Sequence, residues 1–177
     1  MKISGFTFLR NGTLMGYPYL ESIRSLLPLV DEFIINIGDG NDDTYEQVMA
    51  IADPKIRIIR SQWNEGMHAK GFVYAQQKMI AQYSCTGDWA FYLEGDEVLH
   101  ENDLERIRTS MLTHLSNPKI EALAEEGLDL AVFPERLLDA PGLQQVERDL
   151  HLEVELLRGI LLPGLLRNVA HNLNHGV

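Results

Sequence analysis

Three carboxylates follow directly after an apolar run in the middle of the chain. The run WAFYL, residues 89–93, leads into Glu94, Asp96 and Glu97, with Gly95 between the first two. Carboxylates this close raise one another's pKa unless a cation lies between them. An oxygen-only set without Cys or His favours Mg²⁺ or Mn²⁺ over zinc, and Mg²⁺ is usually held by one or two carboxylates together with substrate phosphates. We therefore predict a divalent metal held by Glu94 and Asp96; the alternative is a solvated acidic turn before a helix.

A second acidic loop, GDGNDD at residues 38–43, follows the apolar run EFIINI at residues 32–37. It begins like an EF-hand, but Thr44 stands where that loop requires Gly, and Ala50 stands where it requires Glu. The dinucleotide-binding pattern G-x-G-x-x-G and the Walker P-loop are absent from the sequence. Because Gly, Asn and Asp also build turns, the loop has both a ligand-binding and a purely structural interpretation.

The elements that position these loops alternate along the chain. Apolar runs predict strands, and apolar residues at helical spacing predict the helices between them. This order predicts an α/β fold with a mostly parallel sheet and helices on both faces. Ligands bind such a sheet at the carboxyl ends of its strands, where both acidic loops lie. The predicted strands span 2–9, 32–37, 55–60, 89–93 and 128–133, and the predicted helices span 19–30, 44–51, 67–83 and 102–115.

The composition, 45% hydrophobic and 23% charged over 177 residues, is that of a globular protein with an ample core. The single Cys85 cannot form an internal disulfide, and no uncharged run reaches the roughly 18 residues that span a bilayer. Since the N-terminus also lacks a signal-peptide pattern, we expect a soluble, cytoplasmic protein. The net charge of −11 argues against nucleic acid as a partner.

The last part of the chain, residues 134–177, differs in character from the rest. It is acidic and Leu-rich, and its apolar residues fall on one helical stripe. We therefore predict an α/β domain at residues 1–133 and a helical tail at residues 134–177. Three roles for the tail stay open: core packing, a homodimer interface and a peripheral contact with a membrane.

Four motifs, taken in order, resemble the family 2 glycosyltransferases with the GT-A fold. The first strand ends in Arg10-Asn11, the second ends in a D-x-x-D-x-T loop, and an N-x-G pattern follows the third. The fourth motif, GDWAFYLEGDE at residues 87–97, contains W-x-x-x-L and a D-x-D-type pair of acids. The resemblance covers residues 2–116, and it implies a nucleotide diphosphate sugar as donor and Mn²⁺ or Mg²⁺ as cofactor.

By position, the resemblance assigns the metal and the diphosphate to Glu94 and Asp96, with Glu94 where Asp is usual. It assigns the base and ribose of the donor to the acidic loop, in which Gly40 replaces the usual Ser. The residues it places at the nucleotide sugar are Arg10, Asn11, Asp39, Asp42, Asn64, Gly66, Glu94 and Asp96. The alternatives without ligand binding are ordinary ion pairing for Arg10 and simple helix initiation for the N-x-G pattern.

The implied reaction is transfer of a sugar from the donor to an unknown acceptor hydroxyl. No catalytic base can be named, although Glu125, Glu126 and Asp129 follow the metal motif, where the family places it. The tail does not resemble the acceptor-binding half of the family, so a truncation, an altered reading frame and a separate docking helix all stay open. The alternative function is a catalytically incomplete nucleotide-sugar-binding or assembly protein. A nucleotidyltransferase is the third and least supported function, because the Gly-rich first loop of those enzymes is missing from the sequence.

Overall fold

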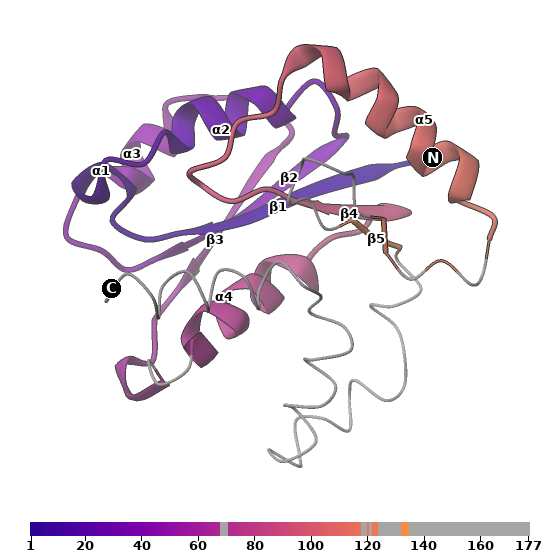
Figure 1. The fold of residues 1–177 in the computed structure, drawn as a ribbon. Helices are drawn as coiled ribbons and strands as arrows, with labels where there is room; N and C mark the ends of the chain where they lie inside the picture. Colours follow the sequence, from indigo (N-terminus) through magenta and orange to yellow (C-terminus); the bar gives the residue numbers. More distant parts are fainter. Residues whose placement is uncertain (68–70, 118–119, 121, 124–131, 135–177) are drawn as a thin grey trace, which may run out of the picture.

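The structure, a computed structural model, describes residues 1–67, 71–117, 120, 122–123 and 132–134 (Figure 1). Its described strands form one sheet in the order β3-β2-β1-β4-β5. Four of them run parallel, and β5 pairs antiparallel with β4. The strands are β1 (Ile3–Leu9), β2 (Glu32–Gly38), β3 (Ile56–Ser61), β4 (Trp89–Tyr92) and β5 (Val132–Pro134).

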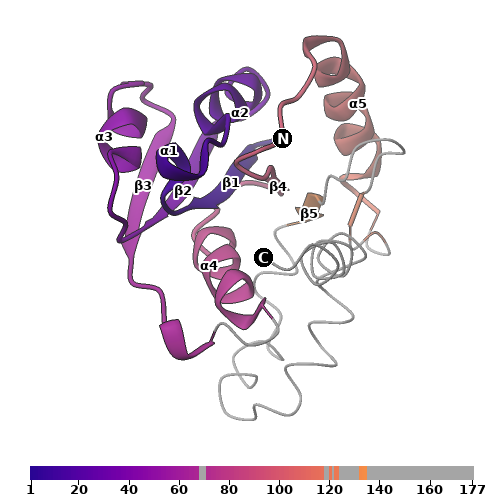
Figure 2. The same cartoon turned by 60° about the vertical axis from the view of Figure 1, so that its left-hand side comes forward.

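Helices cover both faces of this sheet, as Figures 1 and 2 show. Helices α1 (Gly12–Met15), α2 (Tyr19–Leu26), α3 (Thr44–Met49) and α5 (Leu104–His114) lie on one side, and α4 (Phe72–Gln82) lies on the other. Short 3-10 turns occur at η1 (Glu65–Met67) and η3 (Glu101–Asp103). The predicted α/β fold with a mostly parallel sheet and helices on both faces is confirmed. Within the described residues, no helix has the length and apolar character needed to cross a bilayer.

The two faces of the sheet are packed differently, because side chains alternate along a strand. Phe33, Ile35 and Ile37 of β2 are buried in a large core shared with α2, α3 and α5. The opposite face, under α4, carries a smaller apolar cluster and several buried polar groups, among them Asn36, whose amide donates to the Gln77 carbonyl at 3.0 Å. The face of the sheet under α4 therefore combines apolar packing with buried polar groups, of which Asn36 is hydrogen-bonded to the helix.

Several element boundaries differ from the prediction. The helix predicted at 19–30 ends at Leu26, two residues before a proline that cannot continue it. The predicted helix at 67–83 begins only at Phe72, and the one predicted at 102–115 begins at Leu104. The strand predicted at 128–133 is seen only at 132–134, since its earlier residues lie outside the described ranges. The tail beyond residue 134 and the acids at 125, 126 and 129 also lie outside them.

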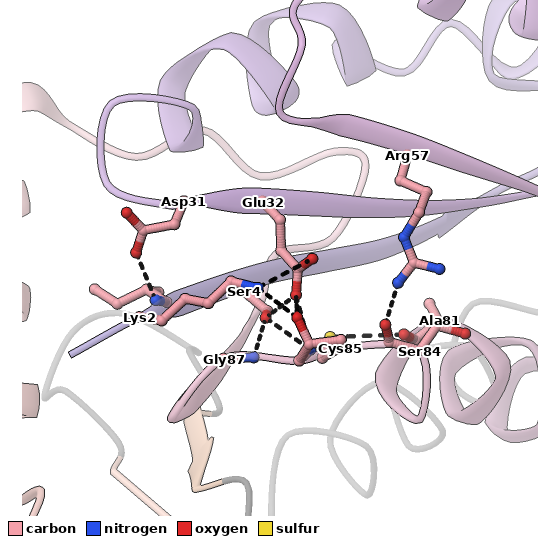
Figure 3. Close-up of polar contacts among 11 residues, drawn as sticks. Lys2, Ser4, Asp31, Glu32, Arg57, Ala81, Ser84, Cys85 and Gly87 are labelled. Atoms are coloured by element: carbon pink, nitrogen blue, oxygen red, sulfur yellow. Dashed lines mark hydrogen bonds and ion pairs between the residues drawn. The ribbon is translucent and has the colours of Figure 1, made fainter.

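Polar contacts fasten the amino-terminal edge of the sheet, where β1, β2 and β4 begin (Figure 3). Ser4 Oγ donates to Glu32 Oε1 at 2.6 Å and accepts from the backbone N–H of Gly87 at 2.8 Å. The backbone and hydroxyl of Thr86 also donate to Glu32, each at 2.7 Å. Partial burial opposes ionisation, but the hydrogen bonds from Ser4 and Thr86 outweigh it and lower the pKa of Glu32. The turn between α4 and β4 is thus tied to the first two strands.

Candidate functional site

The loops after β1, β2, β3 and β4 meet at the opposite, carboxyl edge of the sheet, because these four strands are parallel. This edge is where open α/β sheets bind ligands. It brings together the site residues predicted from the sequence. Those at the ends of β1, β2 and β4 follow their strands directly, and Asn64 and Gly66 lie slightly further along, in the segment that begins η1.

Asn11 joins the loop after β1 to the loop after β2. Its backbone is left-handed, with φ of 54°, and its side-chain Oδ1 accepts from the backbone N–H of Asn41 at 2.8 Å. A Cβ on Gly40 would lie only 2.3 Å from that oxygen. The absence of a side chain at Gly40 therefore makes room for the Asn11 amide.

Asp42 reinforces the same connection. Its Oδ1 accepts from the hydroxyl of Thr44 at 2.7 Å, and its Oδ2 accepts from the backbone N–H of Leu14 at 2.9 Å. Burial alone would raise the pKa of Asp42, but these hydrogen bonds outweigh it and lower the pKa. Asp42 thus holds the two loops together as an ionised carboxylate.

Asp39 lies between two guanidinium groups. Arg60 Nη2 donates to Asp39 Oδ1 at 2.8 Å, and Arg10 Nε donates to the Asp39 carbonyl at 2.9 Å. The hydrogen bond from Arg60 is the main cause of the lowered pKa of Asp39, whose side chain stays about half exposed. Each guanidinium also rests on an aromatic ring, Arg10 at 5.1 Å from the Trp63 centroid and Arg60 at 4.4 Å from that of Tyr45. The result is an ordered, ionised carboxylate that solvent can reach.

Trp63 forms part of an aromatic cluster on the α4 side of this edge. Its ring contacts Phe8 and Tyr74, with centroids 6.2 and 5.4 Å apart. A Cβ on Gly38 would lie 2.2 Å from Trp63 Nε1, so the indole packs on a bare Cα. Trp63 was not predicted, because its contact with Gly38 spans two strands and has no local sequence signal.

Glu94 lies at the end of β4 and is held from several directions. Its carbonyl accepts from Ser22 Oγ at 2.9 Å, and its backbone N–H donates to Glu97 Oε2 at 3.0 Å. Burial, followed by the charges of Glu97 and Asp96, raises the pKa of Glu94 to about 7. The charge of Lys78 and a hydrogen bond with Tyr92 act in the opposite direction. Burial and the two neighbouring carboxylates therefore outweigh Lys78 and Tyr92 in their effect on Glu94.

The neighbours of Glu94 in the motif are placed differently. Gly95 approaches β1 so closely that a Cβ there would lie 2.5 Å from Leu9 Cδ2. Asp96 is exposed, and its charge acts on the nearby Tyr17, whose pKa is raised first by burial and then by Asp96. The motif thus pairs one largely buried carboxylate with one open to solvent.

The N-x-G pattern builds a turn. Asn64 Oδ1 accepts from the Gly66 N–H at 3.0 Å, and the Asn64 carbonyl accepts from the Met67 N–H at 2.9 Å. These contacts form η1, whereas α4 begins later, after Gly71. The N-x-G pattern therefore has a structural role, and the element that it starts is a 3-10 turn instead of the expected helix.

The oxygen chemistry of the acidic motif fits a divalent metal. Glu94 and Asp96 offer two carboxylates at one strand end, which suits Mg²⁺ or Mn²⁺ with substrate phosphates as further ligands. Burial is the first cause of the raised pKa of Glu94, and the charges of Glu97 and Asp96 add to it, a repulsion that a bound cation would reduce. Within the described residues, no three or more His, Cys, Asp or Glu side chains are arranged so that they could together hold a metal ion.

Comparison with solved structures settles the fold. The mannosyltransferase PcManGT from Pyrobaculum calidifontis, in complex with GDP-Man and Mn²⁺, aligns with a TM-score of 0.56 and 14% identity, over 80% of this chain and 46% of its own. The chain has the GT-A glycosyltransferase fold. No protein-family model and no curated protein matches the sequence.

Two other matches to this GT-A chain have lower TM-scores. TarS 1-349 from S. aureus aligns with a TM-score of 0.49 and 17% identity, over 64% of this chain and 33% of its own. Glucosyl-3-phosphoglycerate synthase from Mycobacterium tuberculosis, in complex with Mn²⁺, UDP and phosphoglyceric acid, aligns with a TM-score of 0.46 and 16% identity, over 68% and 41% of the two chains. The chain therefore matches between a third and just under half of the length of these proteins.

Proposed function

We propose that residues 1–133 form the donor-binding unit of a metal-dependent glycosyltransferase, which transfers a sugar from a nucleotide diphosphate to an acceptor hydroxyl. The observation that carries this proposal is the Glu94-x-Asp96 pair at the carboxyl end of β4, beside the loop of the central strand β1 in a GT-A fold. The GDP-Man and Mn²⁺ bound to PcManGT support the classes of donor and metal.

Glu94 and Asp96 would hold the metal. When bound, a divalent ion neutralises the charge that grows on the departing diphosphate. Glu94 is suited to this role because its backbone is fixed on both sides, by Ser22 Oγ at its carbonyl and by Glu97 at its N–H. Asp96 is suited because it is open to solvent, where a ligand can approach.

The nucleoside would lie against the joined loops after β1 and β2. Asp39 offers an exposed, ionised carboxylate to base or ribose donors, and the Arg10 guanidinium lies over the Trp63 ring beside it. Asn11 and Asp42 keep the two loops in one arrangement. In this proposal they shape the nucleoside site through the loops, while Asp39 contacts the ligand.

Calorimetry tests the donor site. We expect UDP or GDP to bind in the presence of Mn²⁺, and Asp96→Asn to weaken that binding about tenfold or more, since one charged metal ligand is lost. Glu101→Gln is the matched control, because Glu101 is an exposed acid outside the motif. Absence of binding of either nucleotide to the unsubstituted chain with Mn²⁺ would refute the proposal.

The second candidate is the alternative function given above, a protein that binds the donor without transferring it. Assays of sugar release and transfer from UDP- and GDP-sugars, combined with sedimentation, separate the two. Tight donor binding by a dimer without turnover supports the second candidate, and a monomer that turns over donor excludes it.

A further inference from the structure

A buried lysine lies under the acidic motif. Lys78 is in the middle of α4, and only 5% of its surface is exposed. A charge in such a place is costly unless other charges or an aromatic face compensate for it. Among the described residues, Lys78 is the only charged side chain that is buried, and the other buried positions of α4 carry neutral side chains, either apolar or amide.

The contacts of Lys78 place its charge close to the acidic motif. The Nζ atom lies 3.5 Å from the centroid of the Tyr92 ring, so the ammonium rests on the last residue of β4. Glu94 follows two residues later and Glu97 shortly after. These two carboxylates are the charges that act on Lys78, and they offset part of the effect of burial, which lowers its pKa to about 8.

We propose that Lys78 is a positioning residue for the diphosphate: its ammonium, seated on Tyr92, supplies a fixed positive charge beneath Glu94 and Glu97. This inference rests on the proposed function. A diphosphate that approaches three carboxylates meets repulsion which a single divalent ion only partly cancels. Because Lys78 is held by packing, its charge is in place before the ligand arrives and needs no reorganisation.

The charge also acts on the acidic loop itself. Lys78 favours the ionised form of Glu94, the form that a metal requires. A neutral side chain of similar length would remove the charge that acts on Glu94 and Glu97 from the α4 side. The phosphate part of the ligand should therefore depend on Lys78, whereas the nucleoside part, which lies toward Asp39, should not.

A ligand series separates these two parts. Calorimetry in saturating Mn²⁺ compares UDP, UMP and uridine on the unsubstituted chain, on Lys78→Met and Lys78→Gln, and on Lys55→Met. Lys55 is the control because its Nζ donates to the Leu27 carbonyl at 2.8 Å, at the opposite edge of the sheet. We expect both Lys78 variants to bind UDP about tenfold more weakly, with uridine affinity unchanged, as for loss of one charge-assisted interaction.

The outcomes are distinct. Equal weakening of UDP and uridine, or no weakening of either, overturns the role of Lys78 while leaving the proposed function intact. An unsubstituted chain that binds none of the three ligands removes the proposed function and this inference together. If neither Lys78 variant unfolds cooperatively, a structure of the unsubstituted chain with Mn²⁺ and UDP decides: Nζ more than about 10 Å from the diphosphate, one screening length, overturns the inference, and a shorter distance supports it.

Discussion

Lowering the pH from 8 to 6 should weaken Mn²⁺ binding far more than an ordinary carboxylate site allows. A metal binds the ionised form of Glu94, whose pKa is raised from 4.5 to about 7. With that pKa, the ionised fraction falls from about 0.9 at pH 8 to about 0.1 at pH 6, whereas an ordinary glutamate stays almost fully ionised. The apparent dissociation constant for Mn²⁺ should therefore rise about tenfold.

The assay is electron paramagnetic resonance of free Mn²⁺ without nucleotide, because phosphate groups titrate in the same pH range. Glu94→Gln should bind Mn²⁺ more weakly at both pH values and lose the pH dependence. Glu101→Gln, which alters an exposed acid outside the motif, should keep it. A change of less than about twofold in the unsubstituted chain would refute the reasoning, since it would place the pKa of Glu94 near its ordinary value.

The stability of the metal-free chain provides an independent check. Since the pKa of Glu94 is higher in the folded than in the unfolded state, the folded state binds the proton more tightly. The free energy of unfolding should thus fall as the pH rises from 4.5 to about 7, by up to about 3 kcal/mol, and this contribution should level off above that. Urea denaturation should show no such fall in Glu94→Gln.

Three further substitutions test the packing of the loops and the sheet. Gly40→Ser should weaken UDP binding about tenfold by calorimetry, because its Cβ would lie 2.3 Å from Asn11 Oδ1. Asn11→Gly in the same chain should restore part of the affinity, and no loss in Gly40→Ser would contradict the role of Asn11 in joining the loops after β1 and β2. Gly38→Ala should lower the free energy of unfolding in urea by about 1–3 kcal/mol, because its Cβ would meet Trp63, and an unchanged value would show that the indole moves freely. Glu32→Gln should cost about 1–3 kcal/mol at pH 7 and less as the pH falls below 4.5, because the lowered pKa of Glu32 makes its contribution present above 4.5 and lost as the pH falls; a cost that does not change with pH would argue against an ionised Glu32.

The sheet could be predicted because its strands are short apolar runs that end in turn residues. Trp89 to Tyr92 are all buried, and the acids that follow them lie at the carboxyl edge, as the parallel order requires. The joining of the loops after β1 and β2 was not predicted. Asp39 and Asp42 as ligand-binding residues stay a prediction, whereas the hydrogen bond from Leu14 to Asp42 depends on the β1–β2 pairing and not on local spacing.

Lys78 could not be predicted, because a lysine in a helix is ordinarily a solvated residue. Its burial follows from the way α4 lies across the sheet, with Lys78 over Tyr92 of a strand that comes later in the chain. The predicted start of α5 was wrong for a local reason. Asn102 was expected to cap the helix, but its backbone N–H instead donates to His100 Nδ1 at 3.1 Å, and a 3-10 turn forms first.

The fastened edge in Figure 3 and the carboxyl edge, where the candidate site lies, are at opposite ends of the same strands. Ser4 and Arg10 are separated by the length of β1, about 20 Å at roughly 3.3 Å per residue. Substitutions that far apart usually have additive effects on free energy. Substitutions at Ser4, Glu32 and Thr86 should accordingly change the free energy of unfolding and leave the candidate site at the opposite end unaltered. The stability of the protein could then be adjusted separately from the binding properties of variants at that site.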